Sequence, residues 1–193
     1  MSIAEMLALI PKRLFDLAIS IAALALLSPL LLGFLTLMTL DMLAVPADRG
    51  GFFSRETRIS RGRPFGLLKF RSARSDGGLT WAGRTLLKPW YLDELPQLVN
   101  VLRGDISLVG PRPWPPEMVQ RQLEDGKDYR NRVIAGLTGA AQVTKGEGTN
   151  YEDLDLLYIR RTQELGGWAL VRYDLEILRR TFAVIARREG LSY

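Results

Sequence analysis

The sequence predicts an α/β protein, mostly α-helical with a small sheet, that carries a membrane-embedded helix near its N-terminal end. One observation is an almost wholly apolar run at residues 14–45, and another is the later mixture of short apolar segments and helix-period stretches. The third observation is the length of 193 residues, which is sufficient for one domain with a sizeable core. We therefore expect a re-entrant membrane helix hairpin at 1–45 and one integrated cytosolic domain at 46–193.

The composition narrows the chemistry open to the chain. It contains no cysteine and no histidine, which excludes Cys/His zinc sites, disulfides, a cysteine nucleophile and Ser-His-Asp triads. Any metal would be a hard ion on oxygen ligands. The net charge of +5 and the pI of about 9.7 indicate an anionic partner, such as nucleic acid, lipid headgroups or a phosphorylated substrate.

The apolar run is long enough to enter a membrane. A straight helix of roughly 30 residues measures about 45 Å, whereas about 20 residues span a bilayer. The run is also too long for a cleavable signal peptide. Pro29 lies at its midpoint, where a proline removes a hydrogen bond and kinks the helix, and the hydroxyl of Ser28 can bond to the loosened backbone.

Two topologies compete for this helix. A spanning helix would put Lys12 and Arg13 on the opposite side of the membrane from the basic domain, which the positive-inside rule disfavours. A re-entrant helix kinked at Ser28 and Pro29 keeps both flanks on one side, because each half of about 15 residues is too short to cross. We expect the re-entrant form, with the domain on the cytoplasmic face.

The patterns of apolar and turn-forming residues predict the remaining elements. Beyond a linker at 46–51, we expect strands at 52–60 and 65–70, a polar loop at 72–83, a short helix ended by Gly104, a strand at 106–109, a helix at 114–123, a charged connection at 125–132 and a helix at 151–165. A basic amphipathic helix follows at 171–188, with Leu175, Leu178, Phe182 and Ile185 on one face. This last helix either lies on an anionic membrane surface or packs against the core.

Two adjacent carboxylates, Asp93 and Glu94, precede the apolar face of the short helix, and Pro96 fits its first turn. Free backbone N–H groups and the helix dipole favour negative charge there. A carboxylate can attack phosphorus while its neighbour holds a divalent cation. Taken alone, the pair also fits a simple helix cap.

Arg112 lies between two prolines in the segment Gly110-Pro111-Arg112-Pro113. Proline fixes its own φ and restricts the residue before it, so this arginine loses little entropy on binding. A guanidinium matches a pair of phosphate oxygens better than an ammonium does. The segment predicts a phosphate contact, with a surface arginine in a turn as the alternative.

These motifs resemble a known family. The stretch 92–113 (LDELPQLVNVLRGDISLVGPRP) resembles the signature of the bacterial sugar transferases, the small monotopic phosphoglycosyl transferases that act on polyprenol phosphate. Residues 69–72 (KFRS), 135–143 (AGLTGAAQV) and 173–178 (YDLEIL) resemble further elements of the family, and so does the membrane segment with its Ser-Pro pair. The resemblance covers nearly the whole chain.

The resemblance implies a reaction. Family members transfer a sugar-1-phosphate from a UDP-sugar to polyprenol (undecaprenyl) phosphate, giving polyprenyl-diphosphate-sugar and UMP. The route is ping-pong, with Asp93 as nucleophile and a phospho-aspartate intermediate, and Glu94 together with Asp93 would hold Mg²⁺. The reaction is the first membrane step of bacterial polysaccharide or glycoprotein biosynthesis, at the inner (cytoplasmic) membrane. The residues that would contact substrate or phosphate are Arg112, Lys69, Arg71, Lys88, Lys145 and Asp174.

The chain departs from the family pattern in places. Lys88 stands where arginine is more common, Tyr91 replaces a usual serine and Ala135 replaces a proline. Residues 144–146 replace the common Asn-Gly-Arg run, and the stretch 161–172 is longer than usual. None of these changes removes the acidic pair or Arg112, so they affect the identity of the sugar more than the reaction.

Two other classes of function are compatible with the composition. One is a membrane-anchored binder of anionic ligands such as nucleic acid, but the chain shows no helix-turn-helix or RNA-binding signature, and we expect no nucleic-acid partner. The other is a catalytically silent membrane scaffold, against which Asp93 and Glu94 argue. We also expect a minimal catalytic form without a further domain. The sugar, the pathway and the oligomeric state, including a homo-oligomer, stay open.

Overall fold

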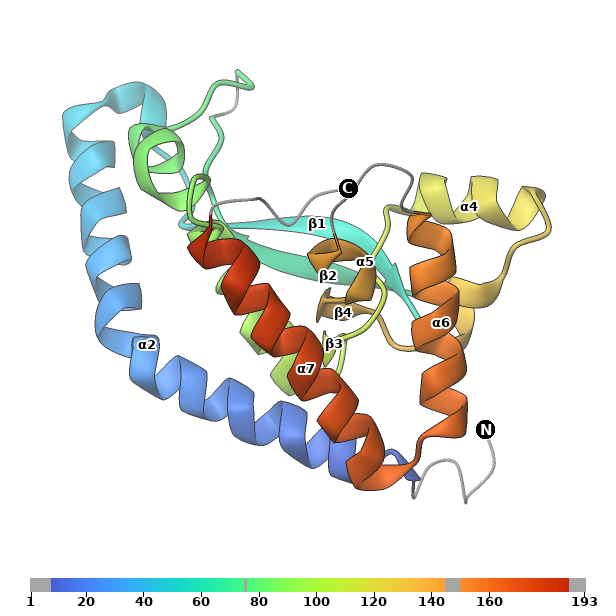
Figure 1. Cartoon of the computed structure of the whole chain (residues 1–193). Helices are drawn as coiled ribbons and strands as arrows, with labels where there is room; N and C mark the ends of the chain where they lie inside the picture. The colour runs from blue at the N-terminus through green and yellow to red at the C-terminus, as the bar shows by residue number, and fades with distance from the viewer. Residues whose placement is uncertain (1–7, 75, 145–149, 188–193) are drawn as a thin grey trace.

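A computed structural model describes residues 8–74, 76–144 and 150–187 of the chain (Figure 1). The protein is mostly helical with two small sheets, as the sequence predicts. Its elements are α2 (Ile10–Ala44), η1 (Pro46–Asp48), β1 (Phe53–Ser60), β2 (Arg63–Phe70), η2 (Gly83–Leu87), η3 (Leu92–Glu94), α3 (Gln97–Arg103), β3 (Ser107–Val109), α4 (Pro116–Glu124), η4 (Tyr129–Arg132), β4 (Gly136–Thr138), α5 (Ala140–Val143), α6 (Tyr151–Glu164) and α7 (Gly167–Ala186).

Two strand pairs organise the centre of the molecule. Strands β1 and β2 form an antiparallel hairpin in which Phe53 pairs with Phe70. Strands β3 and β4 form a short parallel pair in which Ser107 lies opposite Gly136. In Figure 1 the β3–β4 pair is seen between α7 and α6, with the long hairpin behind. Fully buried side chains such as Val109 form the core around β3.

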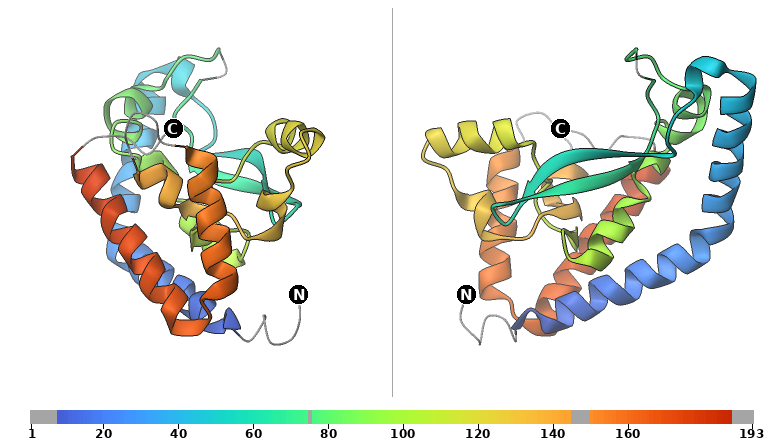
Figure 2. Two further views of the ribbon diagram at one scale, coloured as in Figure 1. Left: turned by 45° about the vertical axis from the view of Figure 1, so that its right-hand side comes forward. Right: turned by 180° about the vertical axis from the view of Figure 1, so that it is seen from behind.

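Helix α2 is one continuous helix of 35 residues that bends near its middle, so that two arms meet at an angle (Figure 2). Pro29 lies inside it, and the Ser28 hydroxyl donates to the carbonyl of Ala25 at 2.8 Å. A proline that removes a backbone hydrogen bond accounts for the bend. Both arms contact the rest of the protein, through buried residues Lys12, Asp16 and Ser20 on the first and Phe34, Met38 and Asp41 on the second.

Polar contacts tie the first arm of α2 to the centre of the fold. The Arg13 guanidinium donates to the carbonyls of Val101 and Leu102, at 2.6 and 2.8 Å, near the C-terminal end of α3. The Asp16 carboxylate accepts a hydrogen bond from the Ser107 hydroxyl at 2.7 Å. These partners lie about 90 residues apart in the sequence, so the arm is an integral part of the fold near β3.

Most of α2 is apolar and exposed, and by length and composition the helix could cross a membrane. Leu26 is 80% exposed, close to the bend. An apolar surface of this extent on a monomer usually marks a binding surface. The other large apolar residues that α2 leaves exposed include Leu14, Ile21, Leu30, Leu32, Leu40 and Leu43.

The segment around the acidic pair differs from the prediction in one respect. The α-helix begins only at Gln97, and Asp93 lies before it in the 3₁₀ turn η3. Tyr91, which precedes this turn, has a left-handed backbone (φ 56°), and the turn closes with 3₁₀-type hydrogen bonds from the Glu94 N–H to the Tyr91 carbonyl and from the Leu95 N–H to the Leu92 carbonyl. Gly104 ends α3 at φ 85°, as expected. The helix-dipole argument for Asp93 therefore does not apply.

Helix α7 begins four residues earlier than predicted, and its predicted apolar face is divided between core and surface. Leu178 and Ile185 are partly buried against the core, whereas Leu175 and Phe182 are 47% and 72% exposed. The fully buried side includes Leu170 and Ile177 and also polar residues with partners: the Thr181 hydroxyl, for example, hydrogen-bonds to that of Thr138 at 2.9 Å. Core packing is thus confirmed, and a second apolar strip stays exposed.

Candidate active site

Asp93 is a buried carboxylate that faces a lysine. Its side chain is 3% exposed, and the Lys88 ammonium lies 2.8 Å from its Oδ2 atom. Lys88 follows the irregular turn η2, and the left-handed residue Tyr91 then turns the chain back toward it. The Lys88 side chain is itself nearly half exposed. The pair therefore places a buried carboxylate beside a cation that solvent can reach.

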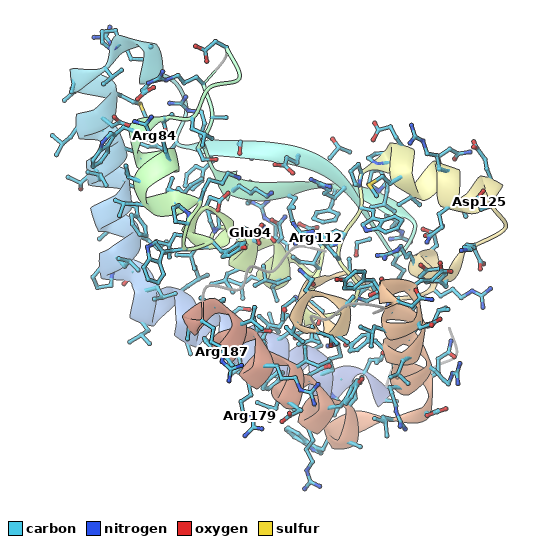
Figure 3. The ribbon with its side chains drawn as sticks, turned by 45° about the horizontal axis from the view of Figure 1, so that its top comes forward. Arg84, Glu94, Arg112, Asp125, Arg179 and Arg187 are labelled. Atoms are coloured by element: carbon cyan, nitrogen blue, oxygen red, sulfur yellow. The ribbon has the colours of Figure 1, made fainter. Side chains whose placement is uncertain are left out.

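Glu94 lies between two further cations. Its Oε1 atom is 3.7 Å from Nη2 of Arg112 and 4.0 Å from Nζ of Lys69. Figure 3 shows Glu94 and Arg112 side by side near the middle of the molecule. The two separations are longer than hydrogen bonds. The three charged side chains therefore come from η3, β2 and the loop after β3. They lie near one another, but Glu94 Oε1 forms no hydrogen bond of ordinary length with either cation.

Glu56 is a site residue that the sequence analysis missed. From β1, its Oε1 atom lies 3.2 Å from Nζ of Lys69, and its other oxygen pairs with Arg58. Burial works against its ionised form, but the Arg58 and Lys69 cations outweigh burial, so the pKa of Glu56 falls below its ordinary value. A signal existed, because Glu56 is the only acidic residue in the stretch 52–70.

A cavity of about 630 Å³ opens beside these residues, and we call it the cationic cavity. Lys69 and Lys88 line it and so connect it to the carboxylates of the site. Among the described residues of its lining, Glu56 is the only acidic one, whereas five are cationic. Such an excess of positive charge concentrates anions. The cationic residues are Arg49, Lys69, Arg71, Arg74 and Lys88.

Arg71 lines the cationic cavity but also has a structural role. Its guanidinium donates to the backbone carbonyls of Gly51 (2.7 Å), Ala73 (3.2 Å) and Asp48. The fully buried Asp48 carboxylate accepts a hydrogen bond from Arg74, which holds the pKa of Asp48 below its ordinary value despite burial. Arg71 therefore fastens the linker after α2 to the edge of the cavity.

Close backbone contact fixes the loop that carries Arg112. Gly110 donates to the Thr138 carbonyl, and Gly136 donates to the Pro111 carbonyl, both at 2.9 Å. A Cβ atom at Gly136 would lie 2.0 Å from the Gly110 nitrogen, and one at Gly139 would lie 2.2 Å from the Gly110 oxygen. These glycines admit the backbone of the Arg112 loop.

The predicted site residue Asp174 pairs with residues other than those around Asp93. Asp174 is fully buried, and its carboxylate binds Lys12 and, at 3.0 Å, the Tyr158 hydroxyl. Burial raises its pKa, although Lys12 opposes the effect. Lys12 donates to the Val109 carbonyl at 3.1 Å, and the Tyr158 hydroxyl oxygen lies 2.8 Å from the same carbonyl oxygen. Asp174 thus supports the strand that leads to Arg112. Lys145 lies outside the described residues.

No group of three or more acidic side chains suited to a metal occurs within residues 8–74, 76–144 and 150–187. The adjacent carboxylates of Asp93 and Glu94 offer hard oxygen donors, the type that Mg²⁺ prefers. A magnesium ion commonly keeps waters and takes substrate phosphate oxygens as further ligands. Two carboxylates therefore fit Mg²⁺ bound together with a phosphorylated substrate.

The fold and the site together define a class: a protein with a long exposed apolar helix and a group of cationic residues beside a buried carboxylate. Comparison with known proteins makes this class specific. A family model described as bacterial sugar transferase matches residues 7–188. The chain belongs to the bacterial sugar transferase family.

Several relatives carry informative names. An undecaprenyl-phosphate glucose phosphotransferase of Komagataeibacter xylinus is 38% identical over 79% of this chain and 32% of its own length. An undecaprenyl-phosphate galactose phosphotransferase of Salmonella typhimurium is 33% identical over 93% of this chain and 41% of its own length. The uncharacterized sugar transferase EpsL of Bacillus subtilis is 33% identical over 95% of this chain and 91% of its own length. The chain thus spans well under half of the first two relatives and nearly all of the third.

Proposed function

We propose that the chain transfers a sugar-1-phosphate from a UDP-sugar to undecaprenyl phosphate, forming undecaprenyl-diphosphate-sugar and UMP as the first membrane step of bacterial glycoconjugate synthesis. The observation that carries this proposal is the buried Asp93 beside Lys88, next to a cavity with five cationic residues. The relatives named as undecaprenyl-phosphate sugar phosphotransferases support it. Phosphoryl transfer needs mainly positioning and charge neutralisation, which these residues supply.

The first step uses Asp93 as a nucleophile. Its carboxylate oxygen attacks the sugar-side phosphorus, the bond from that phosphorus to the bridging oxygen breaks, and UMP leaves with the electron pair. Lys88 holds the carboxylate in place and balances its charge. In the second step an oxygen of the lipid phosphate attacks the phospho-aspartate, and the Asp93 carboxylate is regenerated. Arg112 and Lys69 stabilise phosphate oxygens in both steps.

Glu94 and Asp93 would hold Mg²⁺, which supplies charge neutralisation of the donor diphosphate when bound. The cations near Glu94 stand 3.7 and 4.0 Å away, so its oxygens are not committed to close hydrogen bonds with Arg112 or Lys69. Glu94 thereby keeps carboxylate oxygens for an additional ligand. Its side chain is 17% exposed, which leaves it within reach of solvent.

We further propose that α2 is re-entrant in the inner membrane, with the site on the cytoplasmic face. Both arms contact the same domain, the first through Asp16 and the second through Phe34 and Met38. A helix with both ends on one body leaves its bend free to enter lipid. The exposed apolar residues Leu175 and Phe182 of α7 give the domain a further surface for the membrane interface.

The proposal is tested by measuring UMP release in nanodiscs from UDP-glucose, UDP-galactose and other UDP-sugars, with undecaprenyl phosphate and Mg²⁺. We compare the wild type with Asp93→Asn and with Asp125→Asn, an exposed acidic position at the end of α4 (Figure 3). We expect Asp93→Asn to lose activity by a factor of at least about 1000, EDTA to abolish it and Asp125→Asn to retain it. Full activity in Asp93→Asn, or UDP as product, would contradict the proposal.

The ping-pong order has its own readout. Without lipid acceptor, the wild type should release at most one UMP per active site in a rapid burst, because the phospho-sugar stays on Asp93. Addition of undecaprenyl phosphate should then restore turnover. If the enzyme turns over with acceptor but gives no burst without it, the phosphate passes directly between the two substrates and the covalent route is wrong.

A further inference from the structure

A second cavity, of about 250 Å³, is lined in part by Trp114, which follows the Arg112 loop in the sequence, and we call it the aromatic pocket. Three aromatic residues contribute to its lining: Trp114, Tyr129 and Tyr151. The polar side chains of the lining are those of Gln122, Arg130, Asn150 and Glu152, which come from α4, η4 and the start of α6. The mechanism described above uses none of these residues.

Arg130 joins this pocket to the active site. Its side chain is buried, and Nη1 donates to the Arg112 carbonyl at 2.9 Å. Its guanidinium carbon also lies 3.7 Å from the centre of the Trp114 ring. Among the described residues, the buried Nε of Arg130 has no hydrogen-bond partner. The aromatic pocket and the Arg112 loop therefore share one wall, which still carries a free donor.

The two cavities differ in charge. Among the described residues that line the aromatic pocket, Arg130 is the only cationic one, and the buried Asp155 carboxylate neutralises it. Glu152 adds a negative charge to the lining, although Lys127 pairs with it at 2.7 Å. A site with little net charge does not favour a phosphate. Aromatic rings beside amide and carboxylate groups instead suit a neutral ring that carries hydroxyl groups.

We propose that the aromatic pocket binds the sugar ring of the donor, an inference that rests on the proposed ping-pong transfer. UMP leaves in the first step and the lipid phosphate enters in the second, and both groups are anions. The lipid phosphate approaches the phosphorus from the side that UMP has left. The sugar stays bonded to that phosphorus throughout. The two exchanging anions suit the cationic cavity, and the sugar needs a separate uncharged site that does not empty between steps.

This assignment identifies the residues that select the sugar. Asn150 and Glu152 lie at the start of α6, where the Asn150 side chain accepts a hydrogen bond from the Glu152 N–H at 3.1 Å. Replacing these two side chains changes the groups offered to sugar hydroxyls but leaves Arg112, Lys69 and Lys88 in place. Such changes should act on sugar binding and spare binding of the nucleotide.

The test is the double variant Asn150→Ser/Glu152→Gln, in which serine keeps the helix cap. Arg132→Gln is the matched control, because Arg132 belongs to η4 but is 60% exposed and does not line the pocket. The measured quantities are kcat/KM for UDP-glucose and UDP-galactose and the inhibition constants of UMP, glucose-1-phosphate and galactose-1-phosphate. For the preferred sugar, we expect kcat/KM of the double variant to fall at least tenfold and the inhibition constant of the sugar-1-phosphate to rise at least tenfold. The inhibition constant of UMP should stay within twofold of the wild-type value.

Opposite outcomes overturn the inference. If UMP inhibition weakens together with kcat/KM, the aromatic pocket holds the nucleoside; if neither sugar-1-phosphate is affected, the pocket does not hold the sugar. If the wild type releases no UMP from any donor, the proposed function fails, and direct calorimetric titration with the same two UDP-sugars then decides about the pocket. Loss of that binding in the double variant supports a sugar site. Equal binding to the wild type and the variant rejects it, and so does the absence of detectable binding to both proteins.

Discussion

Asp155 is a buried carboxyl group whose ionisation is linked to folding. Burial raises its pKa from the ordinary 3.8 to about 6, although the neighbouring Arg130 acts to lower it. A carboxyl with a raised native pKa stabilises the folded state fully below its unfolded pKa, and this contribution is lost as the pH rises through the native value. The protein should therefore lose stability from this group between about pH 4 and pH 6.

The prediction is tested with Asp155→Asn, which removes this titration. Between pH 4 and pH 7 the wild type should lose up to about 3 kcal/mol more stability than the variant, from a pKa difference of about two units. Thermal unfolding in detergent, followed at several pH values for both proteins, gives the difference. The comparison of slopes cancels the contributions of other carboxylates. Parallel pH profiles would mean that Asp155 is ionised normally in the folded protein.

Sequence motifs were informative about individual residues where they encode local geometry. The structure brings Asp93, Glu94 and Arg112 close to Lys69 and Lys88, all of which the sequence singled out. Residues whose roles depend on tertiary pairing were harder to recognise. Arg130 looked like part of a charged connection, yet it binds the Arg112 carbonyl. Asp174 looked like part of the basic site, because its partner Lys12 lies 162 residues away in the sequence.

At the scale of elements, the strand pair β3–β4 depends on glycine more than the motif suggested. A Cβ atom at Gly136 would lie within 2.6 Å of backbone atoms of Gly110 and Thr138, which have no room to move. Gly136→Ala should therefore cost at least about 3 kcal/mol or prevent folding. Gly33→Ala is the control, because nothing lies within 4 Å of its Cβ position. Denaturant unfolding of both variants measures the cost, and equal stability would show that β3 and β4 separate easily.

Element boundaries were predictable where the signal was local. The helix expected at 151–165 is α6 (Tyr151–Glu164), which Asn150 caps, and the expected strands match β1 and β2 within two residues. The beginnings of α3 and α7 were not predictable in this way. Tyr91 adopts a left-handed backbone conformation that ordinary side chains rarely adopt, and no sequence rule places it there. The first turn of α7 starts from Gly167 at φ 57°, a position open to glycine.

At the scale of the whole molecule, both arms of α2 support the candidate site. The first arm holds β3 through Asp16, and the second arm packs Phe34 and Met38 against the region of η2 that precedes Lys88. On the proposed re-entrant topology, a lipid phosphate at the membrane surface would meet the cationic cavity without its tail leaving the bilayer. Helix α2 is therefore a structural part of the proposed active site.

The topology of α2 can be tested directly because the chain contains no cysteine. Single substitutions Ser2→Cys and Asp125→Cys mark the sequence before α2 and the domain, and Leu26→Cys marks the exposed apolar surface near the bend. A re-entrant helix predicts that a membrane-impermeant maleimide added to spheroplasts labels neither Ser2→Cys nor Asp125→Cys until the cells are lysed. Leu26→Cys should react slowly in both conditions, because thiols in lipid ionise poorly. Labelling of Ser2→Cys alone in intact spheroplasts would instead establish a helix that crosses the membrane, and the packing of both α2 arms on one domain would then have to change on insertion.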